Sequence, residues 1–420
     1  TEQGLSKASL EHYIKVCGKQ FSKLLSSQQV QAEADRVWCG VERCLFGNGK
    51  ELHFKKLMDF DTIGGKSNKN GARFDLDAMY VNWLGLSLKC YLPKSENSLS
   101  YVWESLKGKI SYCNIKRLMF SSGWRYYAEI VVSGAAPTRV SIGTSTMGID
   151  PGVSTIAGVS EDACVLEELA PNAIQYEKKI QKISQSMDRS RRISNPNKYN
   201  EDGTINRSNR DPWKYSKNYV KMCRLLKSLY RKKHAYIVDS HRELCNKLIT
   251  IARYFPVEKM HFQALQKRAK ETKRQEKKTE VKQKDGTVKV IQKYKRKKRF
   301  GRSINRRAPA RFLLELKRKA EAVGGVYAEV DTKEFKASQY NHVTDTYEKI
   351  PLSQREKEIG KRKVQRDLYS AFLIRNADLD FKHPDREKCE YEFEHFANLQ
   401  DQLILKMKES GLSMRQCFGF

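Results

Sequence analysis

Three acidic residues lie in sequence patterns that could fix a carboxylate at one point of a fold. Asp150 belongs to the stretch GIDPGVSTIAGVS, which starts at Gly148. Met147 and Ile149 predict a strand before it, and a Pro-Gly pair then forces a turn before the apolar run resumes. A carboxylate held where one strand passes into its neighbour is well placed to bind a metal ion. A turn without further function is the alternative interpretation.

Glu258 lies just after Pro256, between Val257 and Met260, in a stretch that predicts a short buried strand. Removing a charge from water is costly, so a carboxylate in such a position needs a partner. That partner could be a metal ion. It could equally be a nearby lysine, if Glu258 lies at the edge of a sheet.

Asp367 stands near the start of a predicted helix, in KRKVQRDLYSAFLIRNAD. The apolar residues that follow it have the spacing of a helix face that packs on a core: Leu368, Ala371, Phe372 and Ile374. A helix dipole favours an acid in the first turn whatever the function, so this position alone does not indicate chemistry.

Composition indicates the kind of partner. The 420 residues include 80 Lys and Arg against 49 Asp and Glu, which gives a formal net charge of +31 and suits a polyanion such as nucleic acid. A membrane surface is the weaker alternative, because the sequence has no apolar run of about 18 residues and no signal peptide. The 10 cysteines form no C-x-x-C pair and are typical of a reducing cytoplasm.

The first third of the chain predicts helices followed by strands. Helical spacing runs over residues 10–25 and again over residues 30–45, where Ser26-Ser27 could cap the second helix. From residue 53 to residue 146 the pattern becomes that of strands, with a hairpin that joins residues 109–120 to residues 124–132. We therefore expect a helical region at 1–50 and a mostly β, barrel-like region at 51–146.

The remaining elements alternate between strands and helices. After Asp150 we expect a strand near residues 163–166, a helix after Pro171, and a polar surface loop over residues 195–211. A long helix is expected over residues 215–255, closing at Pro256. The later predicted elements are a helix at 308–323, a strand at 326–330 and a helix at 391–407.

Residues 268–299 form the most basic segment, with Asp285-Gly286 as a plausible hairpin tip. A mobile clamp on a phosphate backbone fits this composition, and a solvated linker or a nuclear-import signal are the alternatives. The residues that we expect to contact nucleic acid are Lys267, Arg268, Lys295, Arg296, Lys297, Lys298, Arg299, Arg302 and Arg366.

The order of the predicted elements favours an α/β fold with an RNase H-like core that is interrupted by insertions. In such a core the first strand lies beside a later one and a late helix packs across their ends. Asp150, Glu258 and Asp367 could therefore converge. Mg²⁺ or Mn²⁺ could hold the three carboxylates together, and two such ions about 4 Å apart could activate water for attack on a phosphodiester.

The stretches that contain the three acids resemble a known family. GIDPGVSTIAGVS, VEKMHFQALQKRAK and VQRDLYSA are similar to the three RuvC motifs of TnpB, the transposon-encoded RNA-guided nuclease, and of the related type V CRISPR effectors. Residues 303–338, 26–46 and 124–132 resemble, respectively, the helix and strand before the third motif, the recognition helices and the end of the wedge domain of that family.

The resemblance implies that Asp150, Glu258 and Asp367 bind catalytic Mg²⁺ or Mn²⁺ in a RuvC-like endonuclease. Guide RNA and double-stranded target DNA would be its partners, with sequence choice left largely to base pairing. It also implies a prokaryotic, cytoplasmic, nucleoid-associated protein. The expected regions are a nuclease domain at 147–335 with a basic insert at 266–302, a separate insert at 336–362, and the third motif with terminal helices at 363–420.

One departure from the family lies in the insert at 336–362. Family members commonly carry a zinc ribbon with paired C-x-x-C motifs there, whereas ASQYNHVTDTYEKIPLSQRE contains Ser338 and Gln339 but no cysteine. A single histidine, His342, cannot form a structural zinc site, which needs four ligands. We therefore expect no zinc.

Two other functions stay open. The chain could be a nuclease-inactive, RNA-guided DNA-binding repressor, which the missing zinc ribbon favours and the presence of all three acids disfavours. It could also be an RNA-free resolvase or transposase of the RuvC type, although that function poorly explains the regions before Asp150.

Overall fold

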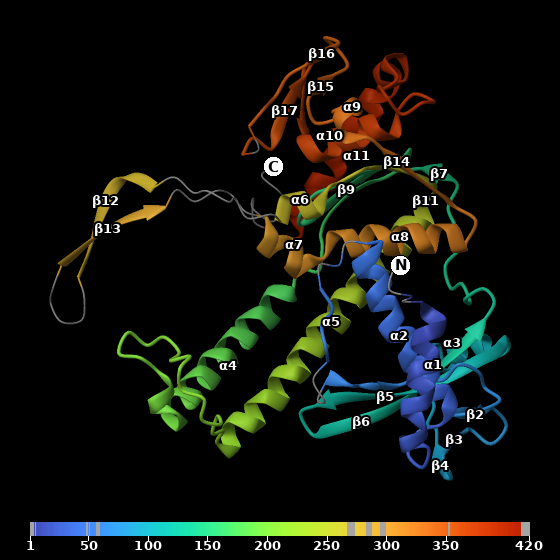
Figure 1. Cartoon of the computed structure of the whole chain (residues 1–420). Helices are drawn as coiled ribbons and strands as arrows, with labels where there is room; N and C mark the ends of the chain where they lie inside the picture. The colour runs from blue at the N-terminus through green and yellow to red at the C-terminus, as the bar shows by residue number, and fades with distance from the viewer. Residues whose placement is uncertain are drawn as a thin grey trace. The chain divides into compact units, whose positions relative to one another are not determined.

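The computed structural model describes residues 4, 6–47, 49, 51–55, 59–266, 274–282, 288–294, 300–351 and 353–412 (Figure 1). The chain forms two compact units. One contains Thr1–Pro137 and Ile180–Arg231, and the other contains Thr138–Lys179 and Lys232–Phe420. The tip Asp285-Gly286 lies outside the described residues, as do seven residues expected to contact nucleic acid: Lys267, Arg268, Lys295, Arg296, Lys297, Lys298 and Arg299.

The second unit is built on one mixed sheet with the strand order β10-β9-β8-β11-β14, and β7 pairs with the start of β11. Strands β8, β9 and β10 are antiparallel neighbours, whereas β11 runs parallel to both β8 and β14. The expected α/β core, with its first strand beside a later one, is thus present. The strands are β7 Ser145–Thr146, β8 Gly148–Pro151, β9 Thr155–Val159, β10 Cys164–Glu168, β11 Ala252–Glu258 and β14 Val326–Val330.

Helices cover the sheet from both faces. Side chains alternate between the two faces of a strand, so neighbouring residues of β9 enter different cores. Ile156 packs with residues of α5 (Lys217–Ile251) and α8 (Pro309–Ala322). Ala157 packs with residues of α10 (Arg366–Arg375) and α11 (Arg386–Glu409).

Helix α10 approaches β8 very closely at Gly148. A Cβ atom on this glycine would lie 2.2 Å from the carbonyl oxygen of Ala371 and 2.3 Å from the backbone nitrogen of Arg375. Only glycine permits that approach. The first glycine of GIDPG therefore has a packing role, which brings the helix that carries Asp367 onto the strand that carries Asp150.

Helix α5 ends five residues earlier than its predicted closure at Pro256. Strand β11 begins at Ala252 and contains Pro256, which pairs with Ala328 of β14. The prediction was wrong because this segment, which contains Tyr254, Phe255 and Val257, lies between two strands of the sheet, where tertiary packing outweighs the helical pattern.

The insert at 336–362 folds without cysteine. It contains two small antiparallel sheets, β15–β16 and β17–β18, and follows the short helix α9. His342 is buried, with Nδ1 2.8 Å from the hydroxyl of Tyr369 and its ring centroid 4.7 Å from that of Phe393. Burial lowers the pKa of His342 to about 4, so the ring is a neutral part of an aromatic core. The elements are α9 Thr332–Phe335, β15 Tyr340–Asn341, β16 Thr346–Tyr347, β17 Glu356–Ile359 and β18 Arg362–Gln365.

The first unit begins with a helical pair. Ser26 caps the second helix as expected, in a reciprocal capping box with Gln29. The first helix, predicted to reach residue 25, ends at Gly18 and continues as a 3-10 turn. The elements are α1 Lys7–Gly18, a 3-10 helix Lys19–Phe21 and α2 Ser27–Leu45.

The β region of this unit consists of two three-stranded sheets, β1-β5-β6 and β2-β3-β4. The expected barrel was wrong for the described part of the chain, where no closed barrel forms. Residues of both sheets and Leu106 of α3 share one apolar core, but no hydrogen-bonded strand pair joins the sheets. The elements are β1 Thr62–Ile63, β2 Arg73–Asp75, β3 Tyr80–Trp83, β4 Leu86–Lys89, α3 Glu96–Leu106, β5 Lys109–Phe120 and β6 Gly123–Ser133.

The remaining elements are α4 Ala173–Ser194, a 3-10 helix Pro196–Lys198, α6 Phe262–Gln266, α7 Gly301–Arg307 and the antiparallel pair β12 Arg274–Lys282 and β13 Val288–Tyr294. No helix in the described ranges is both long and apolar enough to span a membrane.

Candidate active site

Strand pairing brings Asp150 next to Glu258. Ile149 of β8 pairs with Val257 of β11 in parallel register, so the next residue of each strand lies at the same end of the sheet. Strand β11 is internal, between β8 and β14, which removes the alternative of Glu258 as an edge residue.

Asp367 joins them from α10. Gln365 caps this helix by accepting a hydrogen bond from the backbone nitrogen of Leu368, so Asp367 lies in the first turn. Since α10 packs on β8 at Gly148, the first turn reaches the end of the strand that carries Asp150. The structure therefore brings together all three acids that the sequence singled out.

The pKa values of Asp150 and Glu258 are both affected by the neighbouring acids. The pKa of Asp150 is well above its usual range, first because the group is buried and then because of the charges of Glu258 and Asp367. Burial also raises the pKa of Glu258, against the opposing effect of hydrogen bonds from Asp150 and Thr332. Each of these two carboxyl groups thus affects the pKa of the other.

Two arginines contact the carboxylate of Asp367. The Nε and Nη2 atoms of Arg366 lie 3.1 and 2.8 Å from Oδ1, and Nη1 of Arg355 lies 3.2 Å from Oδ2. The side chain of Arg366 is 10% exposed, whereas that of Arg355 is 44% exposed. Arg366, which we expected to contact nucleic acid, contacts Asp367 in the structure. Arg302, also expected to contact nucleic acid, is 79% exposed.

Two functional side chains were missed by sequence reasoning. Thr332 follows β14, whose Val330 pairs with Glu258, and its hydroxyl donates to the carbonyl oxygen of Lys259 at 2.5 Å. A predicted pairing of β11 with β14 would have placed Thr332 near Glu258. Nothing in the sequence indicated that Arg355 contacts Asp367, because Arg355 lies 12 residues earlier in an irregular segment.

The donor set suits a hard divalent cation, because carboxylate oxygens are the ligands that Mg²⁺ and Mn²⁺ prefer. Burial, and then the charges of the other two acids, raise the pKa of Asp150, and a bound cation would favour its ionised form. As the side chains lie, however, no group of three or more His, Cys, Asp or Glu within the described ranges is arranged to hold a metal ion. Binding would require at least one oxygen of Asp367 to become free of its arginine partner.

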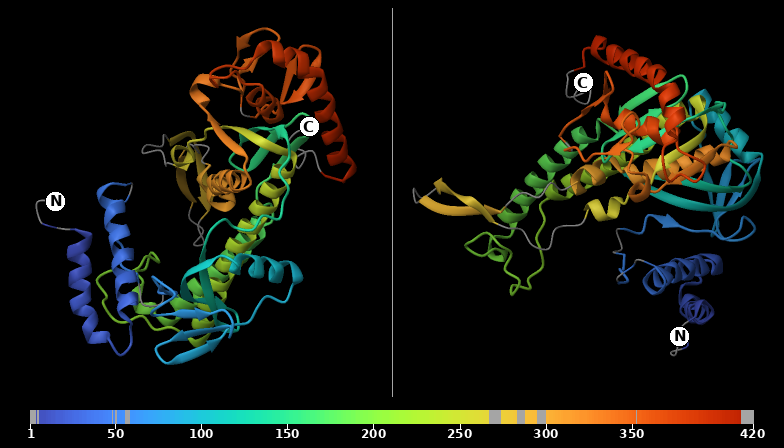
Figure 2. Two further views of the ribbon diagram at one scale, coloured as in Figure 1. Left: turned by 90° about the vertical axis from the view of Figure 1, so that its right-hand side faces the viewer. Right: turned by 90° about the horizontal axis from the view of Figure 1, so that it is seen from above.

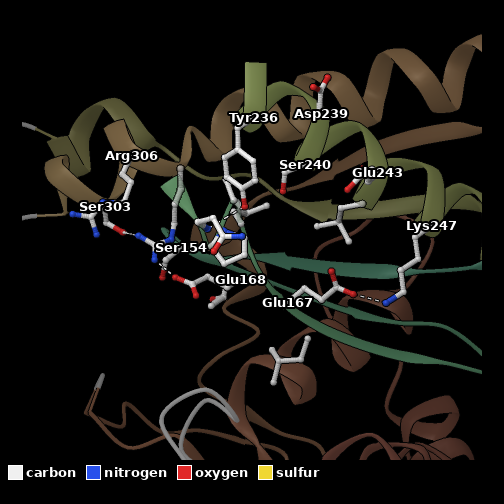
Figure 3. Close-up of a pocket in the computed structure, with 18 of the residues that line it drawn as sticks. Ser154, Glu167, Glu168, Tyr236, Asp239, Ser240, Glu243, Lys247, Ser303 and Arg306 are labelled. Carbon is white, nitrogen blue, oxygen red and sulfur yellow. Dashed lines mark hydrogen bonds and ion pairs between the residues drawn. The ribbon is translucent and has the colours of Figure 1, made fainter. Parts of the chain in front are cut away.

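A cleft of about 1230 Å³ lies in the same unit (Figure 3). Arg355 lines it and so connects it with Asp367, although none of the three acids is part of its wall. Tyr236 projects from α5 towards it, and Lys247 forms an ion pair with Glu167 on the opposite strand. The wall carries both acidic and basic side chains, such as Glu243 and Arg306.

Comparisons with known proteins add little. No family model matches the chain, and no curated protein matches it. One solved structure that matches is titled "Cryo-EM structure of CRISPR-Cas12f Ternary Complex"; it is 13% identical and the match covers 91% of this chain and 75% of that chain. The TM-score is 0.30, and a likeness at that level carries no argument about the fold or activity of this chain.

Proposed function

We propose that this chain is an RNA-guided DNA endonuclease that hydrolyses phosphodiesters at Asp150, Glu258 and Asp367. The observation that carries the proposal is the convergence of these three carboxylates at the ends of two parallel strands and the start of one helix. The RNA-guided part rests on the resemblance of three motifs to the TnpB family and on the net charge of +31.

In this proposal the three carboxylates would hold Mg²⁺ or Mn²⁺, and the bound ion would supply an activated water and stabilise charge on the phosphate. Arg366 stays on Oδ1 of Asp367 and fixes that side chain, because it is nearly buried. The more exposed Arg355 leaves Oδ2 and donates to a phosphate oxygen of the strand being cut.

The test is cleavage by the full chain loaded with its co-purified RNA. Asp150→Ala and Glu258→Ala should each reduce DNA cleavage by about a thousandfold or more while DNA binding changes little. Glu329→Gln on the neighbouring strand β14 is the matched control, because it also removes one carboxylate but lies outside the cluster. Wild-type cleavage by Asp150→Ala would refute the proposal.

A nuclease-inactive DNA-binding protein is the second candidate. The contacts of both oxygens of Asp367 with arginines favour it, because they hold the cluster together without a metal ion. Guide-dependent DNA binding by the wild-type chain, without cleavage at any Mg²⁺ or Mn²⁺ concentration, would support this second function.

A further inference from the structure

The segment from Ile180 to Arg231 is a compact, strongly basic lobe in the first unit, and we call it the α4–α5 lobe. It comprises the end of α4, the 3-10 helix, a loop and the start of α5 (Figure 2). Within these residues 13 Lys and Arg face 4 Asp and Glu, which is a much greater excess of positive charge than in the whole chain. The acid cluster does not explain this excess of positive charge in the lobe.

The loop of the lobe is folded, although the sequence predicted only a polar surface loop over residues 195–211. Asn195 is buried, and its side chain donates to the carbonyl oxygens of Arg191 and Lys214 at 2.8 Å while accepting from the backbone nitrogen of Lys214 at 2.7 Å. Ser190 and Ser216 join the two helices through a hydrogen bond of 3.0 Å. The two ends of the loop are thus fixed to each other.

Cations of the lobe itself lie against its two central aromatic rings, Trp213 and Tyr199. The guanidinium of Arg191 lies 5.5 Å and the ammonium of Lys198 lies 5.1 Å from the ring centre of Trp213. Arg192 lies 4.7 Å from the ring centre of Tyr199, which contacts Trp213 edge-on. Because cations of the lobe already lie against them, Trp213 and Tyr199 are poorly placed to stack on unpaired bases.

Six further cations of the lobe, between residues 207 and 224, are exposed. No ion pair joins these six to another described residue, and on α5 three of them recur at positions i, i+4 and i+7, along one face about 10 Å long. These exposed cations are Arg207, Arg210, Lys214, Lys217, Lys221 and Arg224. Lys227, in contrast, lies 3.9 Å from Asp59.

We propose that the α4–α5 lobe binds the phosphate backbone of a double-stranded RNA segment. Rows of exposed cations on a rigid support recognise regularly spaced phosphates without reading bases, and the lobe's own cations already lie against its two central rings. The inference rests on the proposed function, in which a guide RNA stays bound to the protein before and during DNA cleavage. A binding site that is already folded in the free protein suits such a permanently bound RNA.

The experiment replaces the α5 row in the full chain with Lys217→Gln, Lys221→Gln and Arg224→Gln together. The control carries Lys388→Gln, Lys406→Gln and Lys408→Gln on α11, which are exposed and remove the same charge. Binding of a labelled RNA duplex is measured by fluorescence anisotropy across a series of salt concentrations. Single-stranded RNA and DNA duplex of the same sequence are the other probes.

The lobe variant should bind the RNA duplex about tenfold more weakly, and the slope of log affinity against log salt should fall by about two to three, while the control changes neither. An unchanged slope, or an equal loss in the control, would overturn the inference. A loss confined to single-stranded RNA, or one larger for DNA duplex than for RNA duplex, would also overturn it.

These outcomes are independent of cleavage. If the lobe variant binds RNA like wild type while Asp150→Ala abolishes cleavage, only the inference about the lobe fails. If Asp150→Ala cleaves like wild type, the proposed function fails whatever the lobe binds.

Discussion

The acid cluster and the α4–α5 lobe differ in their electrostatics, because the cluster buries negative charges and the lobe exposes positive ones. In the cluster, buried carboxylates repel one another, and the pKa of Asp150 rises because burial and two neighbouring charges disfavour its ionised form. In the lobe, excess cations are placed on aromatic rings or left in water, and Asp188 pairs with both Arg191 and Arg192. One region therefore buries like charges close together, whereas the other presents its surplus positive charge outward.

The largest effect is expected at the contact that assembles the cluster. Gly148→Ala places a Cβ atom against backbone atoms of α10, which cannot shift without separating α10 from β8. We expect a loss of about 4 kcal/mol or more in the stability of β8 and α10, measured by hydrogen exchange of their amides. Gly301→Ala is the control, because the nearest atom to its Cβ is 3.6 Å away. Equal exchange in both variants would contradict the packing role of Gly148.

The lobe should lose stability without affecting the cluster. Trp213→Ala removes the ring that holds Arg191 and Lys198, and we expect residues 196–216 to become less stable by about 2 kcal/mol by hydrogen exchange. Exchange in β8 and β11 should stay unchanged. Ile193→Ala, at a side chain that is 81% exposed, should change neither region. Faster exchange in β8 after Trp213→Ala would show that the two regions are not independent.

Neutral replacements should stabilise the cluster. A carboxyl group whose pKa is higher in the folded than in the unfolded state binds more protons when folded, so its contribution to stability falls as pH rises from about 4 through the folded pKa. Asp150→Asn and Glu258→Gln remove this loss. At pH 7 each should raise the free energy of unfolding by about 1 kcal/mol and flatten its dependence on pH. A loss of stability at pH 7 would mean that the acids are compensated in the free chain.

The smallest effect is expected at Arg355. Its ion pair with Asp367 is half-exposed, so Arg355→Gln should cost less than about 1 kcal/mol in thermal unfolding. Arg366→Gln, which removes a nearly buried partner of the same carboxylate, should cost more. The reverse order would indicate that Arg355 is the residue that fixes Asp367.

Much of the cluster could be predicted because strand and helix patterns are local. Apolar alternation around Asp150 and Glu258 predicted neighbouring strands, and core spacing after Asp367 predicted the helix that crosses them. The arginines on Asp367 could not be predicted in the same way, because ion pairs depend on side-chain positions that no periodic pattern encodes. The packing role of Gly148 could not be predicted either, because it depends on how closely α10 approaches β8.

The lobe was predicted less well for a related reason. Hydropathy treats the polar residues around Asn195 as solvent-exposed, whereas they satisfy backbone groups and so fold a loop with almost no apolar core. The barrel was wrong because alternation predicts strands but does not determine which strands form hydrogen bonds with each other.

The central claim is that the three carboxylates form a site for a divalent cation, and calorimetric titration of the full chain with Mn²⁺ tests it most directly. Wild type should bind Mn²⁺, and the double variant Asp150→Asn/Glu258→Gln should bind it at least about 100-fold more weakly, while Glu329→Gln binds like wild type. Equal Mn²⁺ affinity in wild type and the double variant would contradict the account.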